Sequence, residues 1–555
     1  MGARVPHGEE ESPKRPELGD LDSFAGIDEL GAIDDPDNTD PDNPDGTFHT
    51  TDHAFEAGGG SGAGVGGVGQ LGDNLALGPV PDLAPTDETH ELDDQGTEEL
   101  PAENGPEARY ELRAVEAELN ERWPETKIEP SLDRVNTLLN LLGDPQKTYP
   151  VLHVAGTNGK GSTARMIDAL LTRMGVRVGR YTSPHLQLVT ERISIDGAPI
   201  SAAKYVDTYR DIAPFVTMVD NASDIRMSKF EVLTGMAFAA FADAPAEAVV
   251  LEVGMGGTWD ATNVADAQVA AITPISIDHT DYLGTDVRDI AREKAGVIKP
   301  GSVVVIAEQE PEVQRVLLER AIEVDASVAR AGSEFAVLER EIAVGGQLLK
   351  LQGLGGVYDQ IFLPLHGKHQ ADNAVLALAA VEAFFGAGKE RQLVVEAVRE
   401  AFAEVQNPGR LERVRAAPAV MLDAAHNPHG ARALAATVTD EFAFRRLVAV
   451  VGVMSDKDAH GILEALEPVV SDVVVTQNSS PRAMPLEELD ELAKSVFGED
   501  RVYAAPRLDG AVETAVALAE ESEDPEEPLA GGGVLITGSV FTAGEARTLF
   551  GKEPA

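Results

Sequence analysis

A glycine-rich turn between an apolar run and a helical pattern carries the clearest chemical signal in the sequence. The apolar run covers residues 149–155, and the helical pattern covers residues 163–174. A buried strand that leads through such a turn into a helix presents backbone N–H groups and a lysine to phosphates. The turn consists of Gly156, Thr157, Asn158, Gly159, Lys160, Gly161 and Ser162.

This turn predicts a protein that uses a nucleoside triphosphate, with Lys160 placed to neutralise the outer phosphates. Its spacing differs from the common Walker form, because two residues separate the first two glycines and Gly161 stands between Lys160 and Ser162. A glycine-rich connection that binds no ligand is the alternative interpretation.

Three more polar residues lie where predicted strands end, and parallel α/β sheets place their ligand crevice at that edge. Ser183 belongs to a hydroxyl-rich turn that either offers an oxygen to magnesium or is only a turn. Glu252 lies within an apolar strand, where a buried carboxylate needs a cation or a set of hydrogen bonds. His279 has carboxylates on both sides, so it fits a metal ligand as well as a structural histidine.

A lysine, an arginine and two polar loops complete the set of chemically notable positions. Lys294, on a helix of apolar character, is either salt-bridged at the surface or buried and functional. The polar residues 423–430 and 538–542 follow strands of a second predicted sheet. Two α/β domains that present such loops to each other would form a cleft, and Arg410 at the junction either reaches a phosphate there or pairs with a nearby glutamate.

Composition excludes several classes of protein. The chain has 555 residues and a formal net charge of −49, and residues 1–100 alone hold 25 Asp and Glu against three Lys and Arg. Both parts of the chain are acidic, which argues against a nucleic-acid binder. No run of 18 apolar residues occurs and the first 16 residues are polar, so we expect neither a membrane span nor a signal peptide.

The sequence contains no cysteine. This excludes disulfides, thiolate metal sites and cysteine nucleophiles, and it fits a cytoplasmic protein. Any metal must take oxygen or imidazole ligands, which favours magnesium partnered by phosphates.

The hydrophobic pattern predicts three parts in the chain. Residues 1–105 are rich in Asp, Glu, Pro and Gly, so we expect a disordered acidic extension. Residues 106–406 alternate apolar strands with amphipathic helices, which predicts an α/β P-loop-type ATPase domain with a mostly parallel sheet. Residues 407–555 repeat the alternation and predict a smaller Rossmann-like α/β domain. The junction lies at 407–410, where Asn-Pro-Gly-Arg interrupts a helical pattern.

Periodicity also places individual elements. We expect an antiparallel hairpin within residues 335–365. Helices are expected near residues 108–123, 131–142, 228–242, 286–298, 371–385 and 392–402. Strands are expected over residues 150–155, 176–181, 248–253, 269–277, 303–307, 420–423, 447–453, 472–476 and 533–537.

Five motifs, taken in order, resemble those of the folylpolyglutamate synthase/dihydrofolate synthase family, which belongs to the wider Mur-ligase group. The resemblance covers about residues 108–550. Gly161 favours the folate branch, since the cell-wall Mur ligases usually place a threonine directly after the lysine. The motifs are residues 156–162, 182–186, 251–257 with 260–263, 293–296 and 423–428.

The resemblance implies a role for each matching position. Residues 156–162 with Asn373, Arg410 and Asp423 would contact ATP. Magnesium would be held by Ser183, Glu252 and His279, and by Lys294 if that lysine is carbamylated as in the family. Lys160, Lys294 and His426 are expected to act in catalysis, with His426 near the incoming glutamate.

The acceptor-binding segments are implied in the same way. They comprise Ser228, Lys229, Phe230, Glu231, Trp259, Asp260 and Ala261. Two departures concern the shape of this pocket: Thr258-Trp259 stands where Arg-Leu is common, and Ala424-Ala425 stands where Gly-Ala is more usual.

The implied activity is an ATP-dependent amide ligase that works through an acyl phosphate. It would join L-glutamate to dihydropteroate, extend folate polyglutamates, or do both, as a monomer that closes about residues 407–410. Lys160 and two magnesium ions would offset the charge on the transferred phosphoryl group. The alternatives are a cell-wall Mur ligase and a nucleotide-binding regulator without catalysis.

Overall fold

The computed structural model describes residues 102–123, 130–388, 391–521 and 531–554. The predicted disordered extension lies outside these ranges except for residues 102–105. Ala102–Asn104 form a short 3-10 helix, and the side chain of Asn104 accepts a hydrogen bond from the amide of Ala202. Within the described ranges, no helix combines the length and apolar character that crossing a membrane would need.

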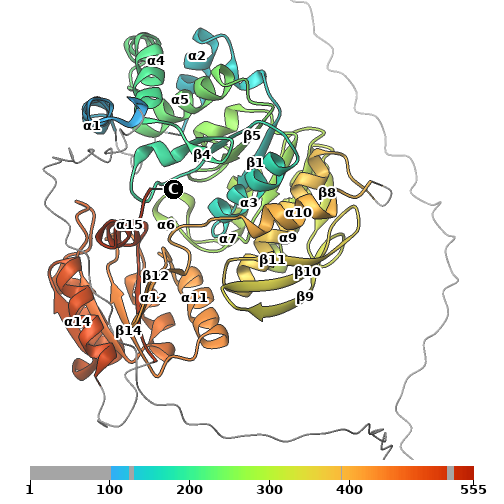
Figure 1. Cartoon of the computed structure of the whole chain (residues 1–555). Coiled ribbons are helices and arrows are strands. Elements are labelled where there is room, and N and C mark those ends of the chain that lie inside the picture. The colour runs from blue at the N-terminus through green and yellow to red at the C-terminus, as the bar shows by residue number, and fades with distance from the viewer. Residues whose placement is uncertain (1–101, 124–129, 389–390, 522–530, 555) are drawn as a thin grey trace, which may run out of the picture. The chain divides into compact units, whose positions relative to one another are not determined.

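The first of two large sheets contains eight strands, of which six are parallel (Figure 1). The strands are β1 (Val151–Ala155), β2 (Val178–Tyr181), β3 (Ile193–Ile195), β4 (Ala198–Pro199), β5 (Ala248–Glu252), β6 (Val269–Ile272), β7 (Val303–Ile306) and β8 (Ser327–Arg330). Their order is β4-β3-β2-β5-β1-β6-β7-β8, and β3 and β4 are antiparallel to their neighbours. Because β1 lies between β5 and β6, the carboxyl ends of all three strands meet at one edge.

Helices cover both faces of this sheet, because successive residues of its strands point to opposite sides. Leu152 and Val154 of β1 pack on one face with α3 (Lys160–Arg173), α9 (Lys368–Phe384) and α10 (Val395–Ala403). Val151 packs on the other face. The helices there are α1 (Pro106–Asn120), α2 (Asp133–Leu141), α4 (Ala202–Ala222), α5 (Lys229–Asp243), α7 (Val287–Ala295) and α8 (Pro311–Glu323).

A small antiparallel sheet extends the first face. It is formed by β9 (Ala336–Ala343), β10 (Gly346–Gln352) and β11 (Val357–Leu363), in the order β11-β10-β9. Leu349, Leu351 and Tyr358 join the core below α9 and α10. The antiparallel insertion predicted at residues 335–365 is therefore confirmed, with one strand more than a hairpin.

The second large sheet has six strands. They are β12 (Glu412–Ala416), β13 (Ala419–Leu422), β14 (Arg446–Val451), β15 (Asp472–Thr476), β16 (Val502–Ala505) and β17 (Gly532–Thr537), in the order β12-β13-β17-β14-β15-β16. All are parallel except β12. One face carries α11 (Pro428–Glu441), α12 (Ala459–Leu466) and α13 (Leu486–Phe497), and the other carries α14 (Leu508–Glu520) and α15 (Val540–Leu549).

The predicted fold class is confirmed, and most predicted elements agree with the observed ones within a few residues. The strand expected at 269–277 is wrong in extent, because β6 ends at Ile272. The strand stops two residues before Pro274, which has no N–H to donate to a ladder. The long helix α4 was not singled out, because Pro214 interrupts its pattern. The domain boundary near residue 407 stays a prediction.

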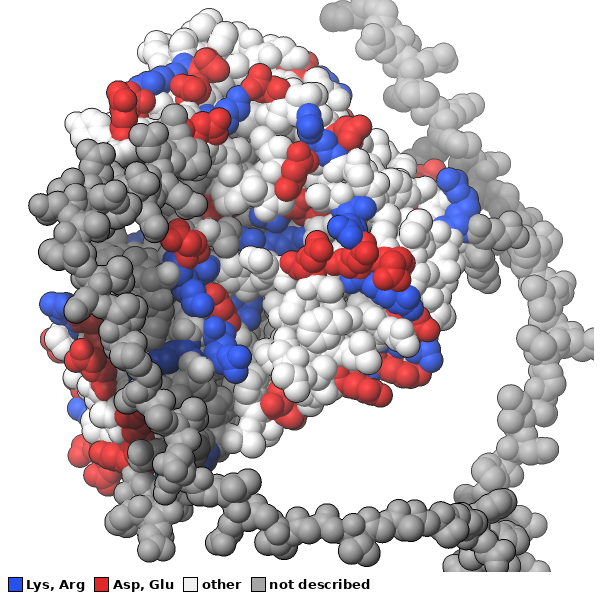
Figure 2. All heavy atoms as spheres, in the orientation of Figure 1, with Lys and Arg blue, Asp and Glu red and all other residues white. Residues whose placement is uncertain are grey.

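Charged side chains of both signs are interspersed on the face shown in Figure 2. One ion pair is instead fully buried beneath the first sheet. Asp168 of α3 lies 2.7 Å from Arg180 of β2, and Arg180 also donates to Ser194 at 2.9 Å. A buried charge of this kind depends on its partner, since neither side chain reaches water.

We expect Asp168→Ala to lower the free energy of unfolding by about 3–5 kcal/mol, because it leaves the Arg180 guanidinium buried without an anion. Glu334→Ala, which breaks the exposed pair with Arg330, should cost less than about 1 kcal/mol. Urea unfolding followed by circular dichroism compares the two variants. Equal losses of unfolding free energy in the two variants would show that burial of the Asp168–Arg180 pair does not matter.

Candidate active site

The glycine-rich turn joins β1 to α3 and is shaped by two glycines with positive φ. Gly156 has φ 139°, and any side chain there would clash with Thr273. Gly159 has φ 89° and caps α3, and a side chain there would clash with Asn373 of α9. Non-glycine residues rarely adopt such backbone angles. The close approach also places the predicted nucleotide contact Asn373 directly against the turn.

The turn leaves a row of amides free at the start of α3. The amides of Thr157 and Asn158 donate to the carbonyl of Pro274 at 3.0 and 3.4 Å. The amides of residues 159–162 open the helix and have no acceptor within the described part of the chain. A helix N-terminus with free N–H groups attracts anions.

Lys160 lies at this helix N-terminus and is surrounded by charge. Its Nζ donates to the carbonyl of Thr157 at 3.0 Å. Burial lowers the pKa of Lys160, and the carboxylates of Glu252 and Asp278 oppose that shift. Both anions therefore lie near the lysine, as the sequence predicted for Glu252.

Glu252 ends β5 beside the turn and is only 5% exposed. Its Oε2 accepts a hydrogen bond from the amide of Ser183 at 3.1 Å, which brings two of the predicted metal ligands together. Burial raises the pKa of Glu252, whereas Lys160, the Ser183 amide and Arg410 lower it. A Cβ atom on Gly161 would lie 3.5 Å from Oε2, so the glycine between Lys160 and Ser162 leaves this carboxylate uncovered.

Lys294, on α7, faces the same region. It is 4% exposed and forms no ion pair with any described residue. Burial and the charge of Lys160 lower its pKa to about 7. Gly257 permits the approach of α7, since a side chain there would clash with the backbone of residues 293–294. Lys294 is therefore buried and not salt-bridged at the surface, and its functional role stays a prediction.

His279 reaches the site from a loop rather than from a strand end. It lies beyond the end of β6, with φ 53°, and caps the short helix α6 (Thr280–Leu283). Burial lowers its pKa to about 3, with a further contribution from Lys457. The charges of Lys160 and Lys294 also act on it, so the four predicted side chains Lys160, Glu252, His279 and Lys294 share one neighbourhood.

Loops that follow strands of the second sheet contribute further side chains to the site. Asn427 exchanges hydrogen bonds with Asn158 of the turn, at 3.1 and 3.3 Å, and donates to Asp278 at 2.9 Å. His429 lies 2.9 Å from Asn158 Nδ2. Lys457 lies 2.8 Å from Asp278 Oδ1. Sequence reasoning assigned no role to Asp278, Asn427 or Lys457, although the polar run at 423–430 marked the loop that contains Asn427.

Arg410 and Asp423 lie at the junction between the two sheets. The charge of Arg410 acts on Glu252, Lys160 and Asp423. Both carboxylate oxygens of Asp423 already accept backbone hydrogen bonds, from Leu411 at 2.9 Å and from Ala425 at 2.8 Å. Asp423 therefore shapes the junction, whatever contact it makes with a nucleotide.

His426 lies between the polar groups of both sheets. Its Nδ1 donates to the carbonyl of Ala424 at 3.0 Å, and its Nε2 lies 4.0 Å from Asp278 Oδ2. Burial lowers its pKa to about 4. The ring is therefore neutral near pH 7 and presents a lone pair on Nε2.

The first predicted acceptor segment mostly serves the fold. Ser228 and Glu231 form a capping box at the start of α5, Glu231 also pairs with Arg134, and Lys229 pairs with Glu116. Phe230 is different, because its ring packs against Gly254 so closely that no side chain fits there. The Phe230 ring is also 6.0 Å from that of Tyr181.

The second predicted acceptor segment likewise contains residues that serve the fold and one aromatic ring beside a glycine. Asp260 accepts hydrogen bonds from the amides of Met255 and Thr262, and Ala261 lies in the core. The Trp259 ring lies against Gly256. Phe230 and Trp259 are therefore the two predicted acceptor contacts whose rings border the glycine-rich loop after Glu252.

Two family models match the chain over both sheets. The Mur ligase middle domain matches residues 154–381, and the Mur ligase glutamate ligase domain matches residues 409–540. The chain is 59% identical over 466 residues to the dihydrofolate synthase/folylpolyglutamate synthase of Mycobacterium tuberculosis, covering 81% of this chain and 96% of that relative. The chain belongs to the dihydrofolate synthase/folylpolyglutamate synthase family of Mur ligases.

Further comparisons agree with this family membership. The Escherichia coli dihydrofolate synthase/folylpolyglutamate synthase is 35% identical over 366 residues, covering 66% of this chain and 81% of its own length. A solved M. tuberculosis folylpolyglutamate synthase complexed with ADP is 58% identical, with a TM-score of 0.77 over 81% of this chain and 100% of that one. E. coli FolC in complex with DHPP and ADP is 31% identical, with a TM-score of 0.68 over 79% and 97%.

The family, the ligase class and the folate branch predicted from the motifs are thereby confirmed. The individual residue roles stay predictions, since the comparisons concern whole chains.

Four histidines, of which His153 is fully buried and the others are partly buried, should make the fold of this ligase sensitive to acid. Burial lowers the pKa of His153 and His279 to about 3, and that of His369 and His426 to about 4. Histidine in the unfolded chain has a pKa near 6.5. Below that pH the unfolded chain therefore binds more protons than the folded chain. Stability is therefore complete above about pH 6.5 and falls as the pH drops toward 4.

His369→Gln should make this fall shallower by up to about 1 kcal/mol per pH unit, because one proton fewer is taken up on unfolding. Urea unfolding at half-unit steps from pH 7 to 4.5 measures the slope. The exposed His460 provides the control His460→Gln, which should leave the slope unchanged. Identical slopes for all three proteins would contradict the account.

Proposed function

We propose that this chain joins the amine of L-glutamate to a carboxylate of dihydropteroate or of a folate, at the expense of ATP. The observation that carries the proposal is the open N-terminus of α3, where free amides and Lys160 face the buried carboxylate of Glu252. Phosphoryl transfer depends mainly on positioning and on charge stabilisation, and both are built into this arrangement.

The proposed ATP site uses both sheets. The amides of residues 159–162 and the side chain of Lys160 would hold the phosphates, with Asn373 beside Gly159 and Arg410 approaching from the junction. Lys457 and Arg410 lie close enough to Lys160 for their charges to act on it, so three cations gather around the turn. They would attract a polyphosphate. The ADP bound by the similar M. tuberculosis structure supports this assignment.

The residues present fit magnesium. The described residues contain no group of three or more His, Asp and Glu side chains arranged to hold a metal by themselves. Magnesium usually takes one or two carboxylates and completes its shell with phosphates and water. Glu252, Ser183 and His279 would hold Mg²⁺ together with ATP, and the ion would neutralise phosphate charge.

Lys294 is proposed to carry a carbamate. A buried lysine amine without a partner can react with CO₂, forming an N–C bond and releasing a proton. The product is an anionic oxygen donor in the place of a cation. This exchange suits a site where Lys160, Arg410 and Lys457 already supply positive charge.

The reaction would follow two displacements. A carboxylate oxygen of the acceptor attacks the terminal phosphorus of ATP, the P–O bond to ADP breaks, and an acyl phosphate forms. The neutral amine of glutamate then attacks the acyl carbon, and inorganic phosphate leaves. His426, neutral and with its Nε2 free of a proton, would orient this amine by accepting a hydrogen bond from it.

The rings of Phe230 and Trp259 are proposed to hold the aromatic acceptor beside the glycine-rich loop. Purified protein with ATP, magnesium and glutamate tests the function when dihydropteroate and tetrahydrofolate are compared as acceptors. Release of ADP that requires both glutamate and one of these acceptors is the expected result. A cell-wall precursor that alone supports ADP release would contradict the proposal.

Replacement of Lys160 separates an enzyme from a regulator without catalysis. Lys160→Met should lower kcat at least about 1000-fold, because a cation that stabilises the transferred phosphoryl group is lost. Coupled measurement of ADP release reads out the change, and the exposed Lys368 provides the control Lys368→Met. A variant with full biological activity in cells and no ligase turnover would favour the regulator.

Carbamylation of Lys294 predicts a distinct spectroscopic signal. Protein equilibrated with ¹³C-bicarbonate should give one protected carbamate resonance that is absent from Lys294→Met. Removal of CO₂ should lower activity reversibly in the unmodified sequence. A spectrum of the unmodified sequence without that resonance, with full activity after CO₂ removal, would contradict the assignment.

A further inference from the structure

The turn that carries Arg410 has an unusual backbone. Gly409 has φ 68° and Leu411 has φ 46°, so left-handed residues flank the arginine on both sides. For a leucine this conformation is unfavourable, because its Cβ approaches the following carbonyl oxygen. Such strain persists only where surrounding contacts hold it, and it gathers at functional sites.

Hydrogen bonds hold the turn on each side of Arg410. The amide of Leu411 donates to Asp423 at 2.9 Å, and the amide of Gly409 donates to Oε2 of Glu412 at 2.8 Å. The carbonyl of Gly409 accepts from the amide of Ala424 at 2.8 Å. Two carboxylates therefore fix the two residues with positive φ, of which Leu411 is the strained one.

Glu412 is in turn held by an arginine of the last helix. Arg547 lies on α15, its side chain is 5% exposed, and its Nε is 3.4 Å from Glu412 Oε2. Its Nη2 donates to the carbonyl of Glu553 at 2.8 Å, whereas Nε and Nη1 have no hydrogen-bond partner. A buried guanidinium with unused donors contributes less to stability than an apolar side chain of similar size.

The junction around Arg547 also contacts the edge of the proposed ATP site. Leu186 packs on Gly409, and its carbonyl lies so close to Gly544 of α15 that no side chain fits there. Gln187 donates to the carbonyl of Lys552 at 2.9 Å. On the other side of the turn, Asn407 donates to the hydroxyl of Ser162 at 2.7 Å.

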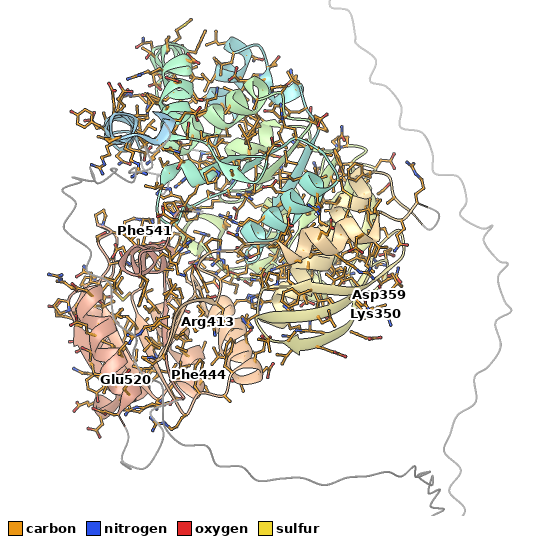
Figure 3. The ribbon with its side chains drawn as sticks, viewed as in Figure 1. Lys350, Asp359, Arg413, Phe444, Glu520 and Phe541 are labelled. Atoms are coloured by element: carbon orange, nitrogen blue, oxygen red, sulfur yellow. The ribbon has the colours of Figure 1, made fainter. Side chains whose placement is uncertain are left out.

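Figure 3 labels a residue on each side of the contact between β12 and α15. Arg413 directly follows Glu412 on β12, and Phe541 lies in the first turn of α15. The contact thus links the last helix to the first residue of the second sheet, two positions after Arg410.

We propose that Glu412 and Arg547 are positioning residues that hold the strained turn 409–411 and so direct Arg410 toward the phosphates of ATP. The inference rests on the proposed role of Arg410 at the nucleotide. Arg547 acts through Glu412, and Glu412 acts through the amide of Gly409. Neither side chain needs to touch ATP.

Kinetics with ATP as the varied substrate test the proposal. Arg547→Met keeps the side-chain volume and removes the charge, and Glu412→Gln weakens the bond to Gly409 with little change in shape. Each should raise the KM for ATP about tenfold with kcat changed less than about twofold, because binding of the phosphates is weakened. Arg547→Lys, which keeps a cation near Glu412, should restore most of the affinity.

A matched control separates this effect from a general loss of stability. Arg446→Met breaks another ion pair of the second sheet, with Asp472 at 2.8 Å. This pair joins β14 to β15 and does not contact the turn. It should leave the KM for ATP unchanged even where thermal unfolding shifts by as much as in Arg547→Met.

A double-mutant cycle decides whether Arg547 acts through Arg410. In an Arg410→Ala background, Arg547→Met should have no further effect on the KM for ATP, because the directed side chain is absent. Independent, multiplicative effects of the two substitutions would overturn the inference. An unchanged KM in Arg410→Ala alone would instead overturn the proposed role of Arg410 at the nucleotide.

Discussion

Glu252 is a carboxylate buried at the end of an apolar strand, and the architecture around it follows from the free energy of keeping it charged. An isolated buried ion costs several kcal/mol, so it requires cations and hydrogen-bond donors nearby. Lys160, Arg410 and the amide of Ser183 supply them. The same neighbourhood also holds Lys294, the free amides of α3 and a second carboxylate, Asp278. It is suited to a ligand that brings both phosphate and metal.

Residues from the loops of the second sheet also interact with the charged groups around Glu252. Asn427 and Lys457 both bind Asp278, and Asn427 also binds Asn158 of the glycine-rich turn. Arg410 enters from a strained turn between the two sheets. Because these contacts are short and polar, a small change in the position of either sheet would alter the charge around Lys160, which suits a site assembled on substrate binding.

The sequence allowed the fold class, most strands and the central residues of the site to be predicted, because buried parallel strands have a strong apolar pattern and polar residues at their ends are conspicuous. Edge strands such as β4, β8 and β16 were missed, since half-exposed short strands lack that pattern. His279 was predicted as a site residue but placed directly at the end of a strand, whereas β6 ends seven residues before it. Asp278, Lys457 and Arg547 act through contacts across large sequence separations, and such pairings cannot be obtained from local patterns.

The transfer of a carboxylate oxygen to phosphate tests the central claim most directly. Dihydropteroate labelled with ¹⁸O in its carboxylate is incubated with the protein, ATP, magnesium and glutamate, and the released phosphate is analysed by mass spectrometry. Attack of glutamate on an acyl phosphate predicts one ¹⁸O atom in each phosphate released. Phosphate that contains no label, while the amide product accumulates, would contradict the proposed chemistry of this site.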